Sequence, residues 1–169
     1  MSQPQRESPS EAAKEFTTAS IEQTRQLGEQ LGRCLRSGDV VALYGELGSG
    51  KTTLIQGVAK GVGVEPDRVK SPTFVLQREY PGATPLIHID GYRLQGGDDV
   101  AWLDTELMFA PSKITVIEWA ERFEGLLPAG RLEIRLQHVS ANRRKLTFRA
   151  VSPRAEQILR TMSHAVACD

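Results

Sequence analysis

The sequence predicts a small three-layer α/β domain whose central sheet is mixed, mainly parallel, and carries an antiparallel hairpin. Two uninterrupted apolar runs, at residues 40–44 and 114–117, are typical of parallel strands that are covered on both faces. Two runs that alternate apolar and polar side chains, at 132–137 and 145–149, are typical of a hairpin with one buried face. Helical spacing of apolar residues after the first buried run gives the strand–helix order of an α/β domain.

The length and the two ends of the chain predict one domain with short appendages. At 169 residues the chain fits a single domain. Residues 1–14 are rich in Ser, Gln, Pro and Glu, so we expect a disordered N-terminal extension. Residues 15–151 are expected to form the domain. Residues 152–169 are expected to form a C-terminal helix and tail, since Ser152-Pro153 supplies an N-cap and a first-turn proline.

The first elements are expected to be a short edge strand at 15–19 and an amphipathic helix. The helix should begin at Ser20, because Ser20 and Gln23 have the spacing of a capping box, and Gly38 should end it. The buried strand at 40–44 follows.

The middle of the chain predicts a second antiparallel pair and another helix. Strands are expected at 73–80 and 85–90, on either side of a turn rich in Pro and Gly at 81–84. A helix is expected at 98–109, and the buried strand at 114–117 comes after it.

A ten-residue segment, YGELGSGKTT, lies directly after the first buried run. Its Gly45, Gly50, Lys51 and Thr52 fit the phosphate-binding pattern G-x-x-x-x-G-K-[ST]. The glycines let backbone N–H groups surround an anion at the start of the next helix, Lys51 reaches the outer phosphates, and the Thr52 hydroxyl is available to Mg²⁺. The strand before the loop and the helix after it are the context that this motif requires. We therefore expect a P-loop NTPase domain that binds a nucleoside triphosphate.

Glu118 ends the second buried strand, which is the layout of a Walker B element. A parallel strand next to the phosphate-loop strand would bring this carboxylate to the metal at the same edge of the sheet. There Glu118 could ligate Mg²⁺ directly, ligate it through water, or polarise the attacking water.

Two further groups of polar residues are candidates for the same edge. In the segment HIDGYR, alternation would put His88 and Asp90 on one face of a strand. Asp90 could be a second carboxylate on the Mg²⁺ side or could orient water, whereas a single histidine such as His88 is more often a structural hydrogen-bonding group. In the segment SPTF, the hydroxyls of Ser71 and Thr73 could meet a phosphate or a metal.

Four motifs in this order, GELGSGKTT, SPTF, HIDGYR and IEWAE, resemble those of one family. The family is TsaE, also called YjeE, bacterial ATPases that serve tRNA threonylcarbamoyladenosine synthesis. The resemblance runs from Phe16 to Val151. One departure is Gly91, where the family usually has Leu, and this change predicts a more flexible backbone beside Asp90 without an apolar anchor.

The resemblance implies that the chain binds ATP and Mg²⁺ and assigns roles to individual residues. Lys51, Glu118 and Asp90 are implied to be catalytic, and Thr52 and Glu118 to be the metal ligands. Ser71 to Thr73 are implied to respond to the nucleotide. The residues implied to bind the nucleotide are Ser20, Gly45, Gly48, Ser49, Gly50, Lys51, Thr52, Thr53, Ser71, Thr73, Glu121 and Arg143.

The resemblance also implies partners. In the family the ATPase joins a complex with the transferase TsaD and its partner TsaB, and ATP supports repeated modification of the adenosine beside the anticodon. The chain itself has 21 basic and 21 acidic residues, so its net charge is zero. This balance argues against wide, independent binding of nucleic acid or of an anionic membrane, and we expect tRNA to be held mainly by the partners.

The cysteines and the absence of long apolar stretches bear on where the protein works, and two alternative functions remain to be weighed. Two distant cysteines, Cys34 and Cys168, predict reduced thiols in a cytoplasmic protein. No stretch has the length of a membrane span or the apolar core of a signal peptide. Two readings besides an accessory ATPase stay open, a small-molecule kinase and a binding module that uses ATP as a conformational clamp.

Overall fold

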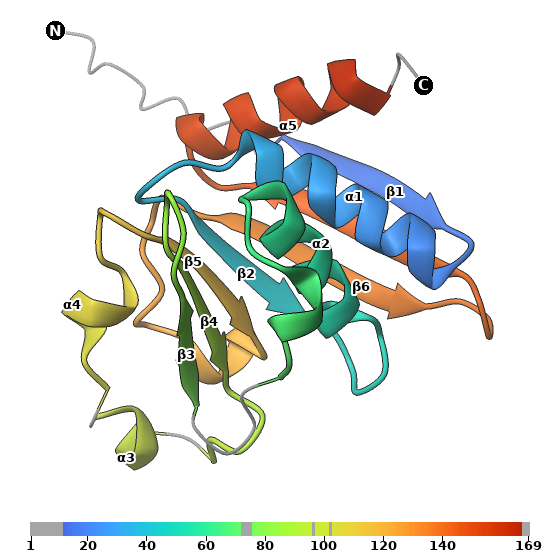
Figure 1. Ribbon diagram of the computed structural model, residues 1–169. Helices are drawn as coiled ribbons and strands as arrows, with labels where there is room; N and C mark the ends of the chain where they lie inside the picture. The colour runs from blue at the N-terminus through green and yellow to red at the C-terminus, as the bar shows by residue number, and fades with distance from the viewer. Residues whose placement is uncertain (1–11, 72–75, 96, 102, 167–169) are drawn as a thin grey trace, which may run out of the picture.

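A computed structural model describes residues 12–71, 76–95, 97–101 and 103–166 (Figure 1). The elements alternate between strands and helices along most of the chain. In order they are β1 (Ala13–Thr18), α1 (Ile21–Cys34), β2 (Val40–Tyr44), α2 (Lys51–Gly61), η1 (Pro66–Arg68), β3 (Gln77–Tyr80), β4 (Leu86–Asp90), α3 (Gly97–Val100), α4 (Thr105–Met108), β5 (Ile114–Glu118), η2 (Ala120–Phe123), β6 (Leu132–His138), β7 (Arg144–Ala150) and α5 (Pro153–Val166).

The sheet has seven strands in the order β1-β7-β6-β2-β5-β4-β3. Its centre is parallel, because β2 pairs in parallel with both β6 and β5, and β5 pairs in parallel with β4. The outer pairings, β1 with β7, β7 with β6 and β3 with β4, are antiparallel. This arrangement confirms the predicted mixed sheet and its hairpin, β6–β7. It also brings Leu43, Glu118 and Asp90 side by side at the carboxyl edge of the parallel strands.

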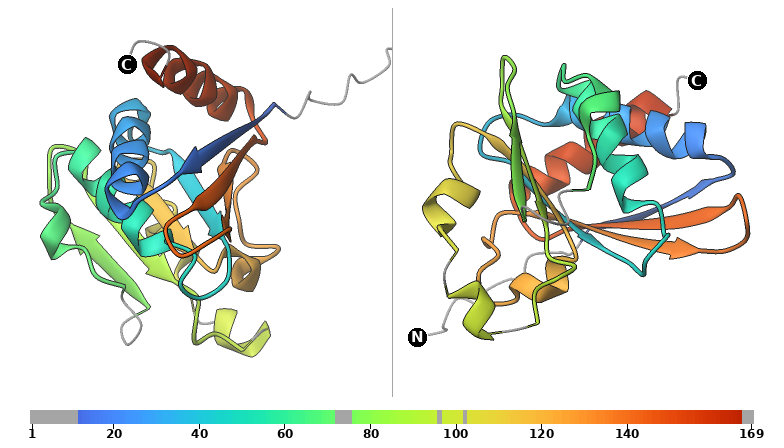
Figure 2. Two further views of the ribbon diagram at one scale, coloured as in Figure 1. Left: turned by 90° about the vertical axis from the view of Figure 1, so that its right-hand side faces the viewer. Right: turned by 60° about the horizontal axis from the view of Figure 1, so that its bottom comes forward.

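One face of the sheet is covered by α1, α2 and α5 (Figure 2). Their apolar side chains, among them Leu31, Ile55 and Met162, form one buried cluster with sheet residues such as Val116 and Phe148. The capping signal at the start of α1 is present, since Ser20 Oγ accepts a hydrogen bond from Gln23 N at 3.1 Å. Gln23 Oε1 accepts in return from Ala19 N at 2.7 Å, one residue before the N-cap.

Helices α1 and α2 touch through glycines. Gly28 and Gly32 on α1 face Gly57 and Gly61 on α2, so each helix presents two glycines four residues apart. A Cβ on any of the four would overlap a backbone carbonyl oxygen of the other helix. The two backbones are therefore in direct contact, which places the start of α1 beside the start of α2.

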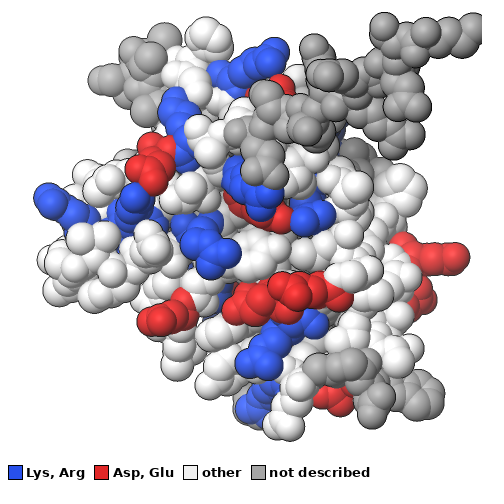
Figure 3. Space-filling model, turned by 180° about the vertical axis from the view of Figure 1, so that it is seen from behind, with Lys and Arg blue, Asp and Glu red and all other residues white. Residues whose placement is uncertain are grey.

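The other face of the sheet is covered over only part of its width. Met108 of α4 and Phe123 of η2 pack on Ile87, Ile89 and neighbouring residues of the central strands. Over β6 and β7 this face is polar and open, and Glu133 there accepts from Arg131 at 2.7 Å and from Arg149 at 3.0 Å. Seen from behind, the molecule shows basic and acidic side chains next to one another on this side (Figure 3). The third layer of the domain, on this second face, is built from short helices and loops.

Helix α5 is tied to the rest of the domain by an arginine. Arg154 donates from Nε to Asp39 Oδ1 at 3.0 Å and from Nη2 to Asp39 Oδ2 at 2.7 Å. The same Nη2 also donates to Cys34 O at 2.8 Å. This pair joins the start of α5 to the connection between α1 and β2. Within the described residues, no helix combines the length and apolar character needed to cross a membrane.

Two helix predictions were wrong in extent. Helix α1 ends at Cys34, with Leu35 as its extended C-cap, and Gly38 instead forms a turn in which its N–H donates to Lys113 O. The helix predicted at 98–109 is two short helices, α3 and α4. Asp104 separates them, because its side chain accepts from Leu107 N and so caps a new helix, the position that aspartate prefers over a helix interior.

Candidate functional site

The loop between β2 and α2 has the backbone of an anion-binding cradle. Gly45, Gly48 and Gly50 have φ values of 153°, 77° and 102°, which other residues rarely adopt. Gly50 is the N-cap of α2 and supplies no side-chain capping bond. The N–H groups of the first turn, together with the positive end of the helix, are therefore available to an anion.

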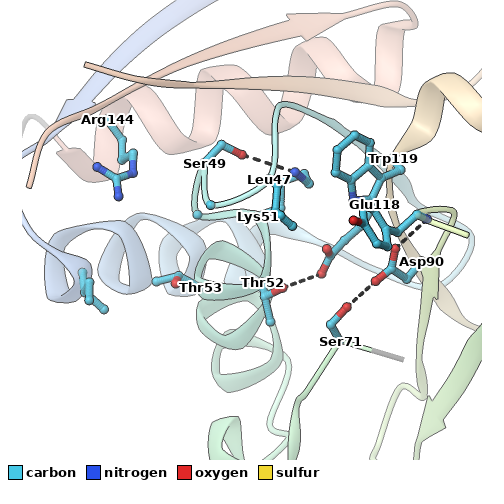
Figure 4. A pocket seen from close by; sticks show the side chains of 14 residues that line it. Leu47, Ser49, Lys51, Thr52, Thr53, Ser71, Asp90, Glu118, Trp119 and Arg144 are labelled. Carbon is cyan, nitrogen blue, oxygen red and sulfur yellow. Dashed lines mark hydrogen bonds between the residues drawn. The ribbon is translucent and has the colours of Figure 1, made fainter. Parts of the chain in front are cut away.

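The ammonium of Lys51 lies in the middle of this loop (Figure 4). Its Nζ donates to Gly45 O at 2.6 Å and to Glu46 O at 2.8 Å, and it lies 4.3 Å from the centre of the Trp119 ring. Burial lowers the pKa of Lys51, and the negative charges of Glu118, Glu121 and Asp90 act in the opposite direction. The loop thus fixes a cation where outer phosphates would lie.

Thr52 and Glu118 meet at the carboxyl edge of the sheet. Thr52 Oγ1 donates to Glu118 Oε1 at 2.9 Å. The buried His88 also contacts the carboxylate, with Nε2 at 3.0 Å from the same Oε1. Both predicted metal ligands are therefore in one hydrogen-bonded group.

Asp90 lies beside Glu118 on the neighbouring strand and links two other segments. One carboxylate oxygen accepts from the Ser71 hydroxyl, and the other accepts from Tyr92 N at 2.9 Å. Asp90 therefore joins Ser71, the first residue of SPTF, to the cavity (Figure 4).

These residues surround a cavity of about 390 Å³. Its walls are the phosphate loop, the ends of β4 and β5, and the beginnings of α1 and β7. The lining residues are Ile21, Leu47, Gly48, Ser49, Gly50, Lys51, Thr52, Thr53, Ser71, Asp90, Tyr92, Glu118, Trp119 and Arg144. A smaller hollow of about 80 Å³ shares Ile21, Gly50, Thr53 and Arg144 with it and includes Ser20.

Most residues predicted for the site line the cavity, and five do not. Ser20 lines the smaller hollow instead. Gly45 lines a separate hollow on the outer side of the loop. Glu121 lies in η2, near enough for its charge to act on Lys51, without lining the cavity. Arg143 belongs to the β6–β7 turn, where it exchanges backbone hydrogen bonds with Ser140. Thr73 lies outside the described residues.

Sequence reasoning missed several lining residues. Arg144 lines both hollows and is held by its own turn, since Nη1 donates to Ser140 O at 2.9 Å. Leu47 and Tyr92 were also missed. Leu47 lies at the tip of the loop and is 75% exposed, and the ring centre of Tyr92 lies 5.3 Å from that of Trp119. The position of Arg144 as the first strand residue after a turn gives no hint of its neighbours, because only the sheet order brings β7 near the loop.

Gly91 is packed closely against η2. A Cβ at this position would lie 2.6 Å from Phe123 Cε2 and 3.0 Å from Trp119 O. Its N–H also donates to Glu118 O at 3.0 Å. The departure from Leu therefore accommodates Phe123, whose buried ring fills the space that a side chain would need.

The oxygen atoms at the cavity suit a hard divalent cation. A hydroxyl from Thr52 and a carboxylate from Glu118 are adjacent, and the carboxylate of Asp90 faces the same cavity. In the described part of the chain, no group of three or more His, Cys, Asp or Glu side chains forms a metal cage. That set fits Mg²⁺, which typically takes one or two protein ligands and completes its shell with phosphate oxygens and water.

Residues 18–146 match the model of the family described as threonylcarbamoyl adenosine biosynthesis protein TsaE. The chain belongs to the TsaE family. Curated members are similar along most of their length. The chain is 46% identical over 116 residues to TsaE of Streptomyces coelicolor, covering 66% of this chain and 77% of that protein. It is 35% identical over 149 residues to TsaE of Bacillus subtilis, covering 88% of this chain and 92% of that protein.

The fold also agrees with a solved structure. A crystal structure of Bacillus subtilis YdiB superposes with a TM-score of 0.76 at 31% sequence identity, covering 92% of this chain and 97% of that one. The predicted P-loop NTPase fold is therefore confirmed. Helix α5 follows the segment that the family model matches.

Proposed function

We propose that this TsaE family member binds ATP with Mg²⁺ and hydrolyses it in support of threonylcarbamoyl modification of tRNA. The observation that carries the proposal is the hydrogen bond between Thr52 and Glu118. It joins the phosphate-loop hydroxyl to the carboxylate at the end of the neighbouring strand, inside a cavity that also contains the Lys51 ammonium. The family to which the chain belongs supplies the pathway.

Binding of the triphosphate rests on the phosphate loop. The N–H groups that follow Gly48 and Gly50 would contact phosphate oxygens, and Lys51 would exchange its bonds to Gly45 O and Glu46 O for bonds to the outer phosphates. Ser49 and Thr53 line the same cavity. Ser20 and Arg143, near the smaller hollow, are proposed to lie toward the nucleoside, and Glu121 is proposed to lie there as well.

Hydrolysis rests on the carboxyl edge of the sheet. Thr52 and Glu118 would hold Mg²⁺, which when bound neutralises charge that develops on the phosphates. Besides holding Mg²⁺, Glu118 would orient the attacking water. Asp90 would support this role from the adjacent strand. Ser71, hydrogen-bonded to Asp90, and the nearby Thr73 are proposed to respond to the γ-phosphate.

The proposed partners are a TsaB–TsaD-type transferase pair, with tRNA held mainly by them. Supporting this, the chain has no net charge, and the back of its sheet carries both signs of charge.

The test is phosphate release from ATP·Mg²⁺ by the purified chain, alone and with a TsaB–TsaD-type pair. We expect slow release alone and faster release with the pair. A matched control with Lys51→Ala in the same mixture should release no phosphate above background. Failure of the pair to change either phosphate release or ATP affinity would refute the accessory-ATPase proposal.

The same assay separates the two remaining readings. A small-molecule kinase would form ADP in proportion to a phosphorylated metabolite and would ignore the partner pair. A binding module that uses ATP as a clamp would change its affinity for the pair with ATP and would show no turnover.

A further inference from the structure

His88 is a buried polar residue in the middle of β4. Its side chain is 0% exposed, and it faces the same side of the sheet as Asp90, two residues later. Its Nε2 lies 3.0 Å from Glu118 Oε1, while its Nδ1 is buried without a hydrogen-bond partner among the described residues. A carboxylate oxygen only accepts, so Nε2 is the donor of the hydrogen bond to Glu118. Among the described residues, the imidazole therefore makes its one side-chain hydrogen bond to this carboxylate.

That single bond is directed at one particular oxygen. Glu118 Oε1 accepts both from His88 Nε2 and from Thr52 Oγ1, at 3.0 Å and 2.9 Å. Among the described residues, none donates a hydrogen bond to Oε2. The two donors belong to different elements, one to the first turn of α2 and one to β4, so together they restrict the rotation of the carboxylate.

We propose that His88 is a positioning residue for Glu118, which turns the carboxylate so that Oε2 is directed to the metal or its water. The proposal rests on the function proposed above and deepens it by adding a residue that touches neither nucleotide nor metal. Groups that orient a metal ligand from behind typically change metal affinity by about 10- to 100-fold when removed. Loss of the His88 bond should therefore weaken the use of Mg²⁺ without weakening the phosphate cradle.

A purely structural role makes a different prediction. A core position enclosed by sheet residues could be filled by an apolar side chain, and a histidine with an unpartnered ring nitrogen contributes little to packing. If the role were structural, replacement of His88 would lower stability and weaken nucleotide binding with and without Mg²⁺ alike. The measurement must therefore separate Mg²⁺ dependence from stability.

The experiment compares His88→Leu with His88→Gln. Leucine removes the donor, whereas the amide nitrogen of glutamine reaches about as far as Nε2 and can replace it. ADP binding is measured by calorimetry over a series of Mg²⁺ concentrations and in chelator. We expect His88→Leu to need about 10-fold more Mg²⁺ for half of the metal-dependent gain in affinity. We expect His88→Gln to need about as much as the wild type, and all three proteins to bind equally in chelator.

Two further variants keep the result interpretable if leucine prevents folding. His88→Asn carries the same amide on a shorter chain that falls short of Glu118, so it should resemble the loss variant while remaining polar. Tyr80→Phe removes the hydroxyl of Tyr80, which is also buried and has no hydrogen-bond partner in the described part of the chain. Tyr80 lies on β3, so this variant should leave the Mg²⁺ series unchanged. Thermal unfolding of each protein confirms that the comparison is made between folded molecules.

The outcomes are distinct. Equal Mg²⁺ requirements in the wild type and in both loss variants would overturn the positioning role, as would an equal defect in His88→Gln and His88→Asn. Absence of any Mg²⁺-dependent ADP or ATP binding by the wild type would instead overturn the proposed function. If the role is correct, the effect of His88→Leu should also disappear when Glu118 is already Gln, because the bond then has no carboxylate to orient.

Discussion

At the scale of single residues, Lys51 is the side chain on which binding depends most. Two backbone carbonyls of the loop hold its ammonium, and the Trp119 ring after β5 lies against it, so its position is fixed largely by the segment that supplies the N–H groups. Preorganised charge of this kind contributes more than a mobile lysine, since little side-chain entropy is lost on binding.

Lys51→Ala is expected to weaken ATP·Mg²⁺ binding by about 10- to 100-fold, because a hydrogen bond to a charged group contributes about 1.5–3 kcal/mol. Calorimetry on the folded variant measures this change. The control is Lys113→Ala, which removes a lysine paired with Glu79 away from the cavity and should leave affinity unchanged. Full affinity in the Lys51 variant would contradict the placement of phosphates in the loop.

Glu118→Gln is expected to retain nucleotide binding at saturating Mg²⁺ and to lower the rate of phosphate release by about 100-fold or more, since a carboxylate that positions or polarises water is lost. Glutamine keeps the shape of the side chain, so the cavity should remain intact. Single-turnover phosphate release measures the rate. Glu124→Gln is the control, because Glu124 is exposed and does not line the cavity. A rate equal to that of the wild type would remove Glu118 from hydrolysis.

The sequence predicted these residues because their chemistry is local or motif-bound. Lys51 and Thr52 follow from one ten-residue pattern, and Glu118 follows from a strand that ends in a carboxylate. The sequence could not predict the role of His88 or Arg144, because each depends on which strand lies beside which. A single histidine in a sequence is more often a structural hydrogen-bonding group. Only the register of β4 with β5 brings His88 within hydrogen-bond distance of Glu118.

At the scale of elements, the contact between α1 and α2 positions the cavity. Glycines on both helices bring the backbones together, and the start of α1, with Ser20 and Ile21, consequently borders the phosphate loop. The sequence contains the signal for this contact in the spacing of Gly28 with Gly32 and of Gly57 with Gly61. Helical periodicity of apolar residues, which predicted both helices, does not detect it, because glycine carries no apolar side chain.

Gly32→Ala is expected to lower the free energy of unfolding by about 1–3 kcal/mol, since its methyl group would push against the Val58 carbonyl and separate the helices. Denaturant unfolding measures the loss. Gly130→Ala is the control, because no heavy atom lies within 4 Å of the position of its Cβ, and it should change stability little. Equal stability of the two variants would show that the helices adjust without cost.

Helix α5 depends on the Arg154–Asp39 pair, and hydrogen bonding to Asp39 raises the pKa of Arg154. Arg154→Ala is expected to destabilise the domain by about 2 kcal/mol, because it leaves the largely buried Asp39 without its main partner. Arg160→Ala on the same helix removes an exposed pair with Glu156 and should cost under about 0.5 kcal/mol. Thermal unfolding compares the two variants, and losses of the same size would contradict a special role for Arg154.

At the scale of the whole molecule, the sequence predicted the architecture of the sheet more fully than the cover on its second face. The sequence predicted the layers, the parallel centre and the hairpin, because buried and half-buried strands have different apolar patterns. The pattern could not predict that the layer on the second face would be short, since polar residues on β6 and β7 show only that one face is not buried. Nor did it predict the break before Asp104, where a local cap overrides helical spacing.

The balanced charge predicts that the chain alone binds tRNA weakly. At about 0.15 M salt we expect no measurable retention of tRNA in a filter-binding assay, because few phosphate contacts are available to release counterions. A basic tRNA-binding protein of similar size run in parallel shows that the assay responds. Submicromolar binding with a steep dependence on salt would contradict this expectation and would place tRNA on this chain directly.

The glycine contacts also determine which side of the cavity yields when its width changes. On the side of α1, the backbones of α1 and α2 are in direct contact at their glycines, so no side chain at that contact can change rotamer to make room. On the side of Ser71, a single hydroxyl joins the segment to Asp90. We therefore expect a ligand that widens the opening to move the Ser71 side more than α1 and α2.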